Sequence, residues 1–265
     1  MYRPILANAL LTLVLVSAAH SIAGPAAQTN TPPQAAVDSL RTLAEKGDAR
    51  AQIELGEMYE LGFGLPKDAI EAAKWYRKAA EQGAVRAQAQ LGMLYLLGKG
   101  VPRDDTQAVK WFRKAAAQGH TEAQFNLATM LQKGQGAPQN FAEAMSLYRA
   151  VAAKGLPQAL FMLGVMYEEG EGVTKSDVEA ASWYRKAADR GYPEAQFKLG
   201  FMYAMEEGVP EDFVRAHMWL SLAAQSQSRV KTTASKTLAA VLKQMTPQQI
   251  AEAEKLAREW KPQGR

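Results

Sequence analysis

Along most of the chain, apolar and polar positions alternate with the period of an α-helix. In residues 49–61 the apolar side chains recur at four-, three- and one-residue steps and share one helical face: Ala51, Leu55, Met58 and Tyr59. A second amphipathic stretch follows Asp68 and continues to about residue 82. Gly62 and Gly83 come after the two stretches, and glycine accepts the left-handed conformation that ends a helix. The pattern predicts a pair of helices, called here helix A and helix B.

This helix pair recurs five times at a constant period of 36 residues. One series of equivalent positions is Gly47, Gly83, Gly119, Gly155 and Gly191, and another is Trp75, Trp111, Leu147, Trp183 and Trp219. Of the 20 glycines, 18 lie on such series, which chance does not produce. One pair cannot bury its own apolar face, whereas stacked pairs can. The sequence therefore predicts an all-α fold, an α-solenoid of five helix–turn–helix repeats.

Each helix B is predicted to begin with a polar cap. Asp68 can accept hydrogen bonds from the first free N–H groups, and Glu71 can cap back. The same pairing recurs in later repeats as Asp104/Gln107, Asn140/Glu143 and Ser176/Glu179. It fails in the fifth repeat, where Arg215 follows Asp212.

The N-terminal residues have the pattern of a secretory signal peptide. Arg3 precedes an apolar run over residues 5–19, and small residues at Ser21 and Ala23 suit a cleavage site. The run is shorter than the roughly 20 residues that span a bilayer, although a retained anchor stays open as an alternative. We expect a signal peptide over residues 1–23 and a periplasmic or secreted mature chain without a transmembrane segment.

The rest of the chain divides into a linker, a repeat region and two caps. Residues 24–33 are small, polar and proline-containing, and indicate a flexible linker. Residues 34–46 align with a helix B and predict an N-terminal capping helix; the solenoid covers residues 47–227. Residues 228–265 predict C-terminal capping helices over 229–245 and about 247–259. Thr246 and Gln249 offer a capping box for the last helix, and Trp260 a packing anchor.

The repeated residues resemble the Sel-1-like repeat (SLR) family, a relative of the tetratricopeptide repeats. In the first repeat the matching positions are Gln52, Leu55, Gly56, Tyr59, Gly62, Gly64, Asp68, Ala72, Trp75, Tyr76, Ala79, Ala80 and Gly83. The resemblance covers about residues 49–224. It implies a right-handed superhelix whose A helices line the concave side, and a role as an adaptor for other proteins without catalysis.

The composition and the charge distribution exclude several kinds of site and partner. The absence of cysteine excludes disulfides, a thiol nucleophile and thiolate metal sites, and the 3 histidines form no motif, so we expect no metal and no cofactor. Residues 24–224 carry 22 basic and 24 acidic side chains, whereas residues 225–265 carry 8 and 3. An exported chain with a near-neutral body is a poor nucleic-acid binder. The basic end allows a weak contact with an anionic surface.

The concave A-helix face is the candidate binding groove. Opposite the face that contains Leu55, the equivalent positions become apolar toward the last repeats, where a protein or peptide partner of the cell envelope could dock. The groove candidates are Phe125, Phe161, Phe197, Phe201, Met93 and Val165. The rim candidates change from positive to negative along the array: Arg50, Arg86, Glu122 and Glu194. Packing between neighbouring A helices is the alternative explanation of the apolar positions.

The sequence favours a protein–protein interaction scaffold over an enzyme. Ser228 and Lys231 match the spacing of a serine β-lactamase motif, but the companion motifs of that fold are absent. No pairing of a nucleophile with a base stands out, so we expect no catalytic residue. Two alternatives stay open: an envelope hydrolase of β-lactamase or cell-wall type, and a tether that binds the membrane or cell wall through residues 225–265.

Overall fold

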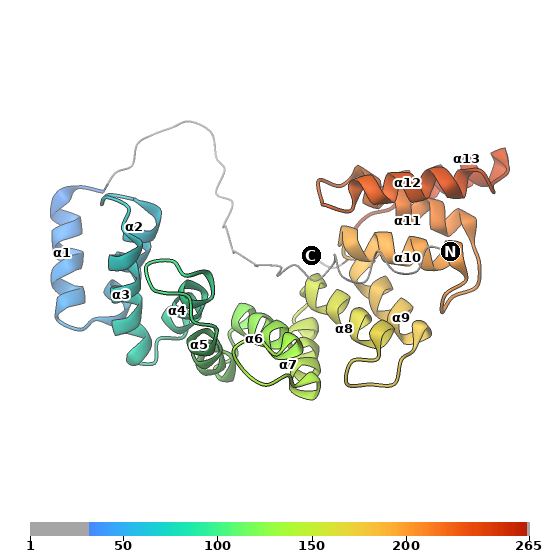
Figure 1. Cartoon of the computed structure of the whole chain (residues 1–265). Coiled ribbons are helices and arrows are strands. Elements are labelled where there is room, and N and C mark those ends of the chain that lie inside the picture. Colours follow the sequence, from blue (N-terminus) through green and yellow to red (C-terminus); the bar gives the residue numbers. More distant parts are fainter. Residues whose placement is uncertain (1–31, 264–265) are drawn as a thin grey trace. The chain divides into compact units, whose positions relative to one another are not determined.

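The computed structural model describes residues 32–263, and this part of the chain is built from α-helices joined by turns (Figure 1). The predicted all-α fold class is therefore confirmed. The predicted signal peptide lies outside the described residues, as does most of the predicted linker.

The helices alternate between helix A and helix B after the first, which is the N-terminal cap. In chain order they are α1 (Gln34–Glu45), α2 (Ala49–Leu61), α3 (Ala69–Glu81), α4 (Val85–Leu97), α5 (Asp105–Ala117), α6 (Thr121–Lys133), α7 (Phe141–Ala153), α8 (Pro157–Glu169), α9 (Asp177–Ala188), α10 (Pro193–Met205), α11 (Phe213–Gln225), α12 (Lys231–Leu242) and α13 (Pro247–Glu259). The even-numbered helices from α2 to α10 are the A helices, and their partners α3 to α11 are the B helices.

The chain forms two compact units, one ending at Asn140 and the other beginning at Phe141. In the first unit each of the helices α1 to α5 packs on the one that follows it. In the second unit the same holds for α7 to α11, and α13 also packs on α11. Each unit thus has the nearest-neighbour stacking of an α-solenoid.

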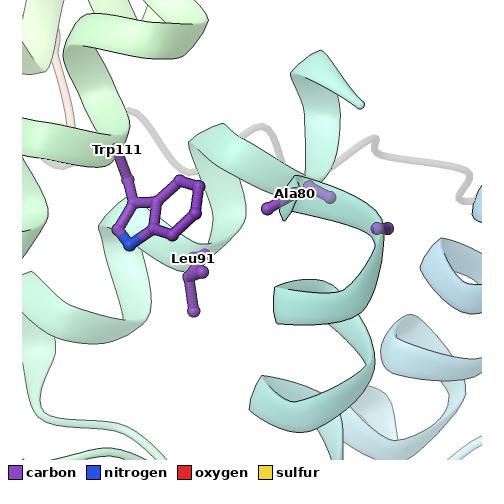
Figure 2. Packing of buried hydrophobic residues seen from close by; sticks show 5 residues of the cluster. Ala80, Leu91 and Trp111 are labelled. Atoms are coloured by element: carbon purple, nitrogen blue, oxygen red, sulfur yellow. The ribbon is translucent and has the colours of Figure 1, made fainter. Parts of the chain in front are cut away.

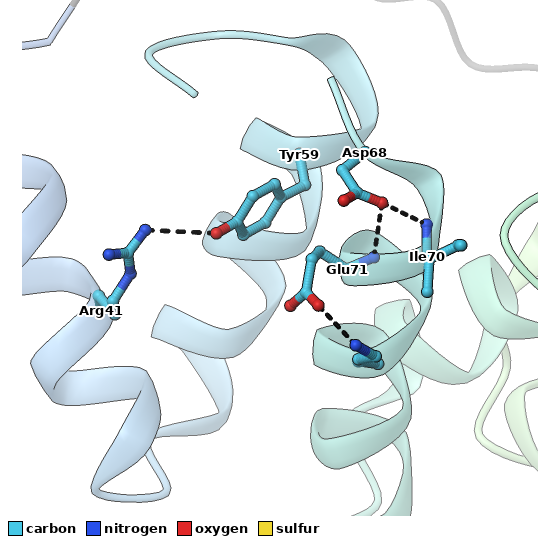
Figure 3. A network of polar contacts seen from close by, with 6 residues as sticks. Arg41, Tyr59, Asp68, Ile70 and Glu71 are labelled. Carbon is cyan, nitrogen blue, oxygen red and sulfur yellow. Dashed lines mark hydrogen bonds and ion pairs between the residues drawn. The ribbon is translucent and has the colours of Figure 1, made fainter. Parts of the chain in front are cut away.

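Helix ends follow the predicted turn chemistry. Asp48 accepts a hydrogen bond from the Ala51 N–H at the start of α2 (2.7 Å), and Gly62 ends that helix in the left-handed region at φ +76°. At the start of α3 the Asp68 carboxylate accepts from the N–H groups of Ile70 and Glu71 (Figure 3). These bonds fix where both helices of the pair begin.

The second half of the predicted capping box differs at α3. The Glu71 carboxylate lies 2.6 Å from the Lys74 ammonium rather than on the backbone of Asp68 (Figure 3). A lysine one turn away is a stronger partner for a carboxylate than a solvated N–H. A complete reciprocal box is recorded at Thr246 and Gln249, where the last helix begins.

In the fifth repeat, where the sequence lacks the capping pair, one of the two capping hydrogen bonds still forms. The Asp212 carboxylate accepts from the Arg215 N–H at 2.8 Å, although Arg215 has no carboxylate with which to cap back. The Arg215 guanidinium instead lies 3.5 Å from the Asp212 carboxylate. The backbone bond needs only the Asp212 side chain, so replacing the fourth residue of the box does not remove it.

Small residues set how closely the two helices of a pair approach. A Cβ added to Gly92 would lie 2.8 Å from the Phe112 ring, and one added to Gly164 would lie 2.5 Å from the Tyr184 ring. Consecutive pairs are joined by apolar clusters such as Ala80, Leu91 and Trp111 (Figure 2). Within each pair, the buried ring of Phe112 or Tyr184 thus occupies the space that a side chain at Gly92 or Gly164 would need.

Buried glutamines link one repeat to the next. Gln88 on α4 is 4% exposed, and its Nε2 donates to the Ala80 carbonyl of α3 at 3.2 Å. Its Oε1 accepts at 2.8 Å from Nε2 of Gln118, the residue that follows α5. Gln52 and Gln82 repeat this arrangement one repeat earlier. Both ends of each buried amide are thus satisfied.

A second set of links joins helix B of one pair to helix A of the next through arginine and tyrosine. Arg41 donates to the Tyr59 hydroxyl at 3.3 Å (Figure 3), and Arg77 donates to that of Tyr95 at 2.7 Å. These contacts recur at 18 residues' separation and tie the half-buried Arg41 and the exposed Arg77 to the repeat framework.

The C-terminal helices pack as caps, and α12 is shorter than predicted at both ends, since it ends at Leu242 rather than at 245. Helix α12 begins at Lys231 rather than at 229 because residues 226–230 form bends and turns held by the Ser226 and Ser228 hydroxyls. Trp260 packs against Trp219 with 6.1 Å between ring centroids. Within residues 32–263, no helix is both apolar and long enough to cross a bilayer.

Candidate functional site

Three phenylalanines expected to line an open groove are buried. Phe125, Phe161 and Phe197 are 2%, 4% and 3% exposed. The ring centroid of Phe161 lies 5.3 Å from those of Tyr184 on α9 and Tyr192 before α10. The prediction of an open position is corrected for these three rings, because a helix inside a stack buries more than one face. The packing alternative holds for them.

The other groove candidates, Met93, Val165 and Phe201, are only half-buried. In the second unit two of them lie one helical turn from an ion pair that joins α8 to α10, since Val165 precedes Glu168 by three residues and Phe201 follows Lys198 by three. The name α8–α10 surface is used here for the partly or fully exposed residues around this pair: Met162, Val165 and Glu168 on α8, and Lys198, Phe201 and Met205 on α10. Met205 is 52% exposed, so this face presents apolar atoms to its surroundings.

A partly buried ion pair joins the two helices of the α8–α10 surface. The Lys198 Nζ lies 2.8 Å from both carboxylate oxygens of Glu168, and the two side chains are 18% and 19% exposed. The Tyr184 hydroxyl of α9 donates to Glu168 Oε2 at 2.5 Å. Burial raises the pKa of Tyr184 well above its ordinary value, and the Glu168 charge adds to this shift. The phenol therefore stays protonated and holds the carboxylate in place.

The first unit has a related but more polar arrangement. Arg86 of α4 lies 2.6 Å from the Glu57 carboxylate of α2, and Tyr76 donates to Glu60 at 2.8 Å. Burial raises the pKa of Glu57, while the Arg86 charge opposes the shift. Glu57 occupies the position that Val165 and Phe201 occupy in the second unit. The first unit has Glu57, Met93 and Thr129 in this series, so only the second unit has apolar residues at two consecutive equivalent positions.

Three of the four predicted rim residues form ion pairs within the chain. In the first unit Arg50 pairs with Glu54 at 3.0 Å and Arg86 with Glu57 at 2.6 Å, whereas Glu122 lies 3.3 Å from the His120 Nδ1 that accepts from the Ala123 N–H. In the second unit Glu194 is 8% exposed and lies 3.7 Å from Arg229. The rim charges are thus largely compensated, and Glu194 is buried rather than displayed along a rim.

Comparison with known proteins decides the family. A family profile described as Sel1 repeat matches residues 49–83, 85–120, 121–156, 157–192 and 193–228. The chain belongs to the Sel1 repeat family. The resemblance inferred from the 36-residue series is confirmed, and so is the number of repeats.

Two solved structures are similar to this Sel1 repeat protein over most of its length. A Sel1 repeat protein from Oxalobacter formigenes is 34% identical, with a TM-score of 0.73, and the match covers 86% of this chain and 94% of that one. The protein c5321, described as a protective antigen present in uropathogenic Escherichia coli strains and displaying an SLR fold, is 30% identical with a TM-score of 0.68. That match covers 84% of this chain and 56% of c5321, so this chain spans little more than half the length of c5321. No curated protein matches the chain.

The residues whose side chains could take part in catalysis or metal binding make contacts within the fold. The Ser228 hydroxyl accepts from the Val230 N–H at 3.3 Å and from the Ser226 hydroxyl at 3.1 Å, so it belongs to the turn before α12. His217 is 4% exposed, and its Nδ1 lies 3.3 Å from Ser221 Oγ on the next turn of α11. Among residues 32–263, no three acidic or histidine side chains come together as a metal site.

Sequence reasoning missed the ion pair that organises the α8–α10 surface. A signal was present for the tyrosine that holds the glutamate of this pair, because the first and fourth repeats combine a tyrosine on helix B with a glutamate on helix A. These combinations are Tyr76 with Glu60 and Tyr184 with Glu168, whereas the second repeat has Phe112 with Leu96. Reading the two positions together would have indicated a buried phenol–carboxylate bond.

Proposed function

We propose that this Sel1 repeat protein is an exported interaction scaffold that docks a segment of a partner protein on the α8–α10 surface. The observation that carries the proposal is the accessible apolar face formed by Val165, Phe201 and Met205 beside the fixed Glu168–Lys198 pair. Exposed apolar groups gathered on one face favour contact with another protein. The proposal includes no catalytic step.

The chemistry of the face suits an amphipathic segment. Half-buried Val165 and Phe201 offer shallow apolar contacts, and Met205 can adjust its flexible thioether to the side chain that meets it. The Glu168–Lys198 pair retains part of its exposure and can hydrogen-bond a polar group at the edge of the segment. A partner helix or strand with apolar side chains on one side would match this arrangement.

Rigidity of the face supports docking with little reorganisation. The two helices are held by Tyr184 through Glu168 and by Lys198 across the helix interface. A preformed surface loses less conformational entropy on association than a flexible one. Export is part of the proposal on the strength of the N-terminal pattern, and the description of a similar protein as a protective antigen fits a place in the cell envelope.

The test is a cross-linking capture from envelope extract with the full chain and two variants. Phe201→Ser/Met205→Ser removes the apolar face, whereas Val178→Ser is the matched control because Val178 is 65% exposed on α9. A partner captured by the wild type and the control but lost with the double variant supports the proposal. Equal capture by all three proteins, with equal helicity, places the contact elsewhere and contradicts it.

A further inference from the structure

The outer face of α12 carries cations without counter-charges. Between Asp212 and Glu252 the chain has no acidic residue. Its basic side chains in this stretch are Arg215, Arg229, Lys231, Lys236 and Lys243. The two arginines pair with Asp212 and Glu194, respectively. Lys231 and Lys236 lie on α12, and Lys243 directly follows it. All three lysines are exposed, and their side chains make no ion pair or hydrogen bond within residues 32–263.

The neighbouring helix shows that this charge pattern is specific to α12. Helix α13 packs on the same helix, α11, and is also exposed on its outer side. Its cations are compensated one turn away, since Arg258 lies 3.5 Å from Glu254 and Lys255 lies 4.0 Å from Glu259. The positive charge of the C-terminal region is therefore concentrated on α12 rather than spread over both helices.

The side chains between the lysines are short. Thr232, Ser235, Ala239 and Ala240 are the exposed residues of α12 that separate them. Lysine stems extend well beyond such side chains, so the ammonium groups can reach a flat surface while the helix lies parallel to it. The exposed face contains no large apolar residue that would require a pocket in the partner. A planar array of anions matches this shape better than a folded groove.

We propose that α12 docks this protein onto a membrane surface of anionic phospholipids through Lys231, Lys236 and Lys243. The contact is electrostatic and peripheral. Each lysine close to an anionic bilayer contributes roughly a fivefold factor to the partition coefficient, so three give on the order of 100-fold. The attraction acts over a Debye length of about 10 Å at 0.1 M salt, which makes it reversible by added NaCl.

The test is vesicle co-sedimentation of the full chain. Vesicles of pure phosphatidylcholine are compared with equimolar phosphatidylcholine and phosphatidylglycerol, so that any binding through the apolar N-terminal residues is common to both. The variant Lys231→Gln/Lys236→Gln/Lys243→Gln removes the α12 cations and keeps good helix formers. The variant Lys255→Gln/Arg258→Gln/Lys261→Gln is the matched control, since it changes the net charge equally.

The wild type and the control are expected to bind the anionic vesicles more strongly than the neutral ones, and added NaCl abolishes the difference. The α12 variant is expected to lose this preference by about 100-fold while its helicity is unchanged. Equal losses in both variants would mean that net charge alone matters, and would overturn the proposal. The proposal is also overturned if the wild type binds anionic and neutral vesicles equally. This holds even if α12 then binds an acidic polypeptide such as polyglutamate.

Discussion

The Lys198 ammonium of α10 lies 2.8 Å from both carboxylate oxygens of Glu168 on α8, 30 residues earlier in the chain. The pair joins consecutive A helices, and the same carboxylate holds the buried Tyr184 hydroxyl of helix B. One glutamate thus fixes the mutual position of three helices. The apolar atoms of Val165 and Phe201 lie on the two helices that it holds together.

Breaking this pair from the lysine side should destabilise the second unit. Lys198→Met leaves a largely buried carboxylate without its cation, which we expect to cost about 2 kcal/mol of unfolding free energy. Adding Glu168→Gln removes the unpaired charge and keeps an acceptor for Tyr184, so the double variant should recover about 1 kcal/mol. Urea unfolding followed by circular dichroism measures both values.

The control for that experiment is Lys255→Met, because Lys255 and Glu259 are 67% and 63% exposed. An exposed pair contributes little, and we expect no measurable change. If the double variant is as unstable as Lys198→Met, the loss comes from packing rather than from the unpaired carboxylate, and our account of the pair is wrong.

The buried glutamines should matter more than their small number suggests. Gln88→Leu deletes two hydrogen bonds and leaves the Ala80 carbonyl and the Gln118 amide without this partner. We expect a loss of about 1–2 kcal/mol, measured by urea unfolding. Gln244→Leu, in the exposed turn after α12, is the comparison variant. Equal stability of the two variants would show that the buried amide is not a link between repeats.

The close approach of α8 and α9 at Gly164 predicts a steric penalty for a larger residue there. A Cβ on Gly164 would lie 2.5 Å from the fully buried Tyr184 ring, which has no room to move away. Gly164→Ala should therefore cost about 2–3 kcal/mol in thermal or urea unfolding. Gly47→Ala meets no atom within 4 Å and suffers only from its positive φ of +97°, so it should cost about 1 kcal/mol. A tolerated alanine at 164 would contradict the close approach of α8 and α9.

The repeat period predicted most of the fold because each signal is local. Asp48 and Gly62 mark the two ends of α2, and its predicted bounds agree with the structure. The final helix is likewise fixed by Thr246 and by the proline that follows it. Helix α12 was predicted too long, since hydroxyl-supported turns at Ser226 and Ser228 do not change the apolar pattern.

The site was harder to predict because it depends on which helix faces are covered. A helical wheel separates two faces of one helix but does not say that both meet neighbours, and Phe161 and Phe197 are buried for that reason. Ion pairs such as Arg86–Glu57 also depend on the stacking of separate repeats. The accessible face is therefore smaller than predicted and is concentrated on α8 and α10.

Buried His217 gives the folded protein a specific pH dependence. Burial lowers the pKa of His217, and the Glu254 charge of α13 opposes the shift only partly. A histidine whose folded pKa lies below its unfolded value of about 6.5 stabilises the fold above that pH. This contribution is lost as the pH falls through the folded pKa, with a slope of at most about 1.4 kcal/mol per pH unit.

Unfolding free energies of the wild type and His217→Gln, measured from neutral to mildly acidic pH, check this expectation. The wild type should lose stability relative to the variant as the pH falls, because glutamine has no proton to gain. Parallel profiles for the two proteins would mean that His217 does not titrate differently in the folded and unfolded chains.

The most direct test of the central claim, that a partner docks on the α8–α10 surface, is site-specific photo-cross-linking in living cells. A photoreactive phenylalanine analogue is placed at Val165 in one chain and at Val178, which is 65% exposed on α9, in another. We predict a discrete cross-linked protein at position 165 and none at 178, and loss of the product when Phe201→Ser/Met205→Ser is added. A partner that cross-links at 178 but not at 165 would contradict the account.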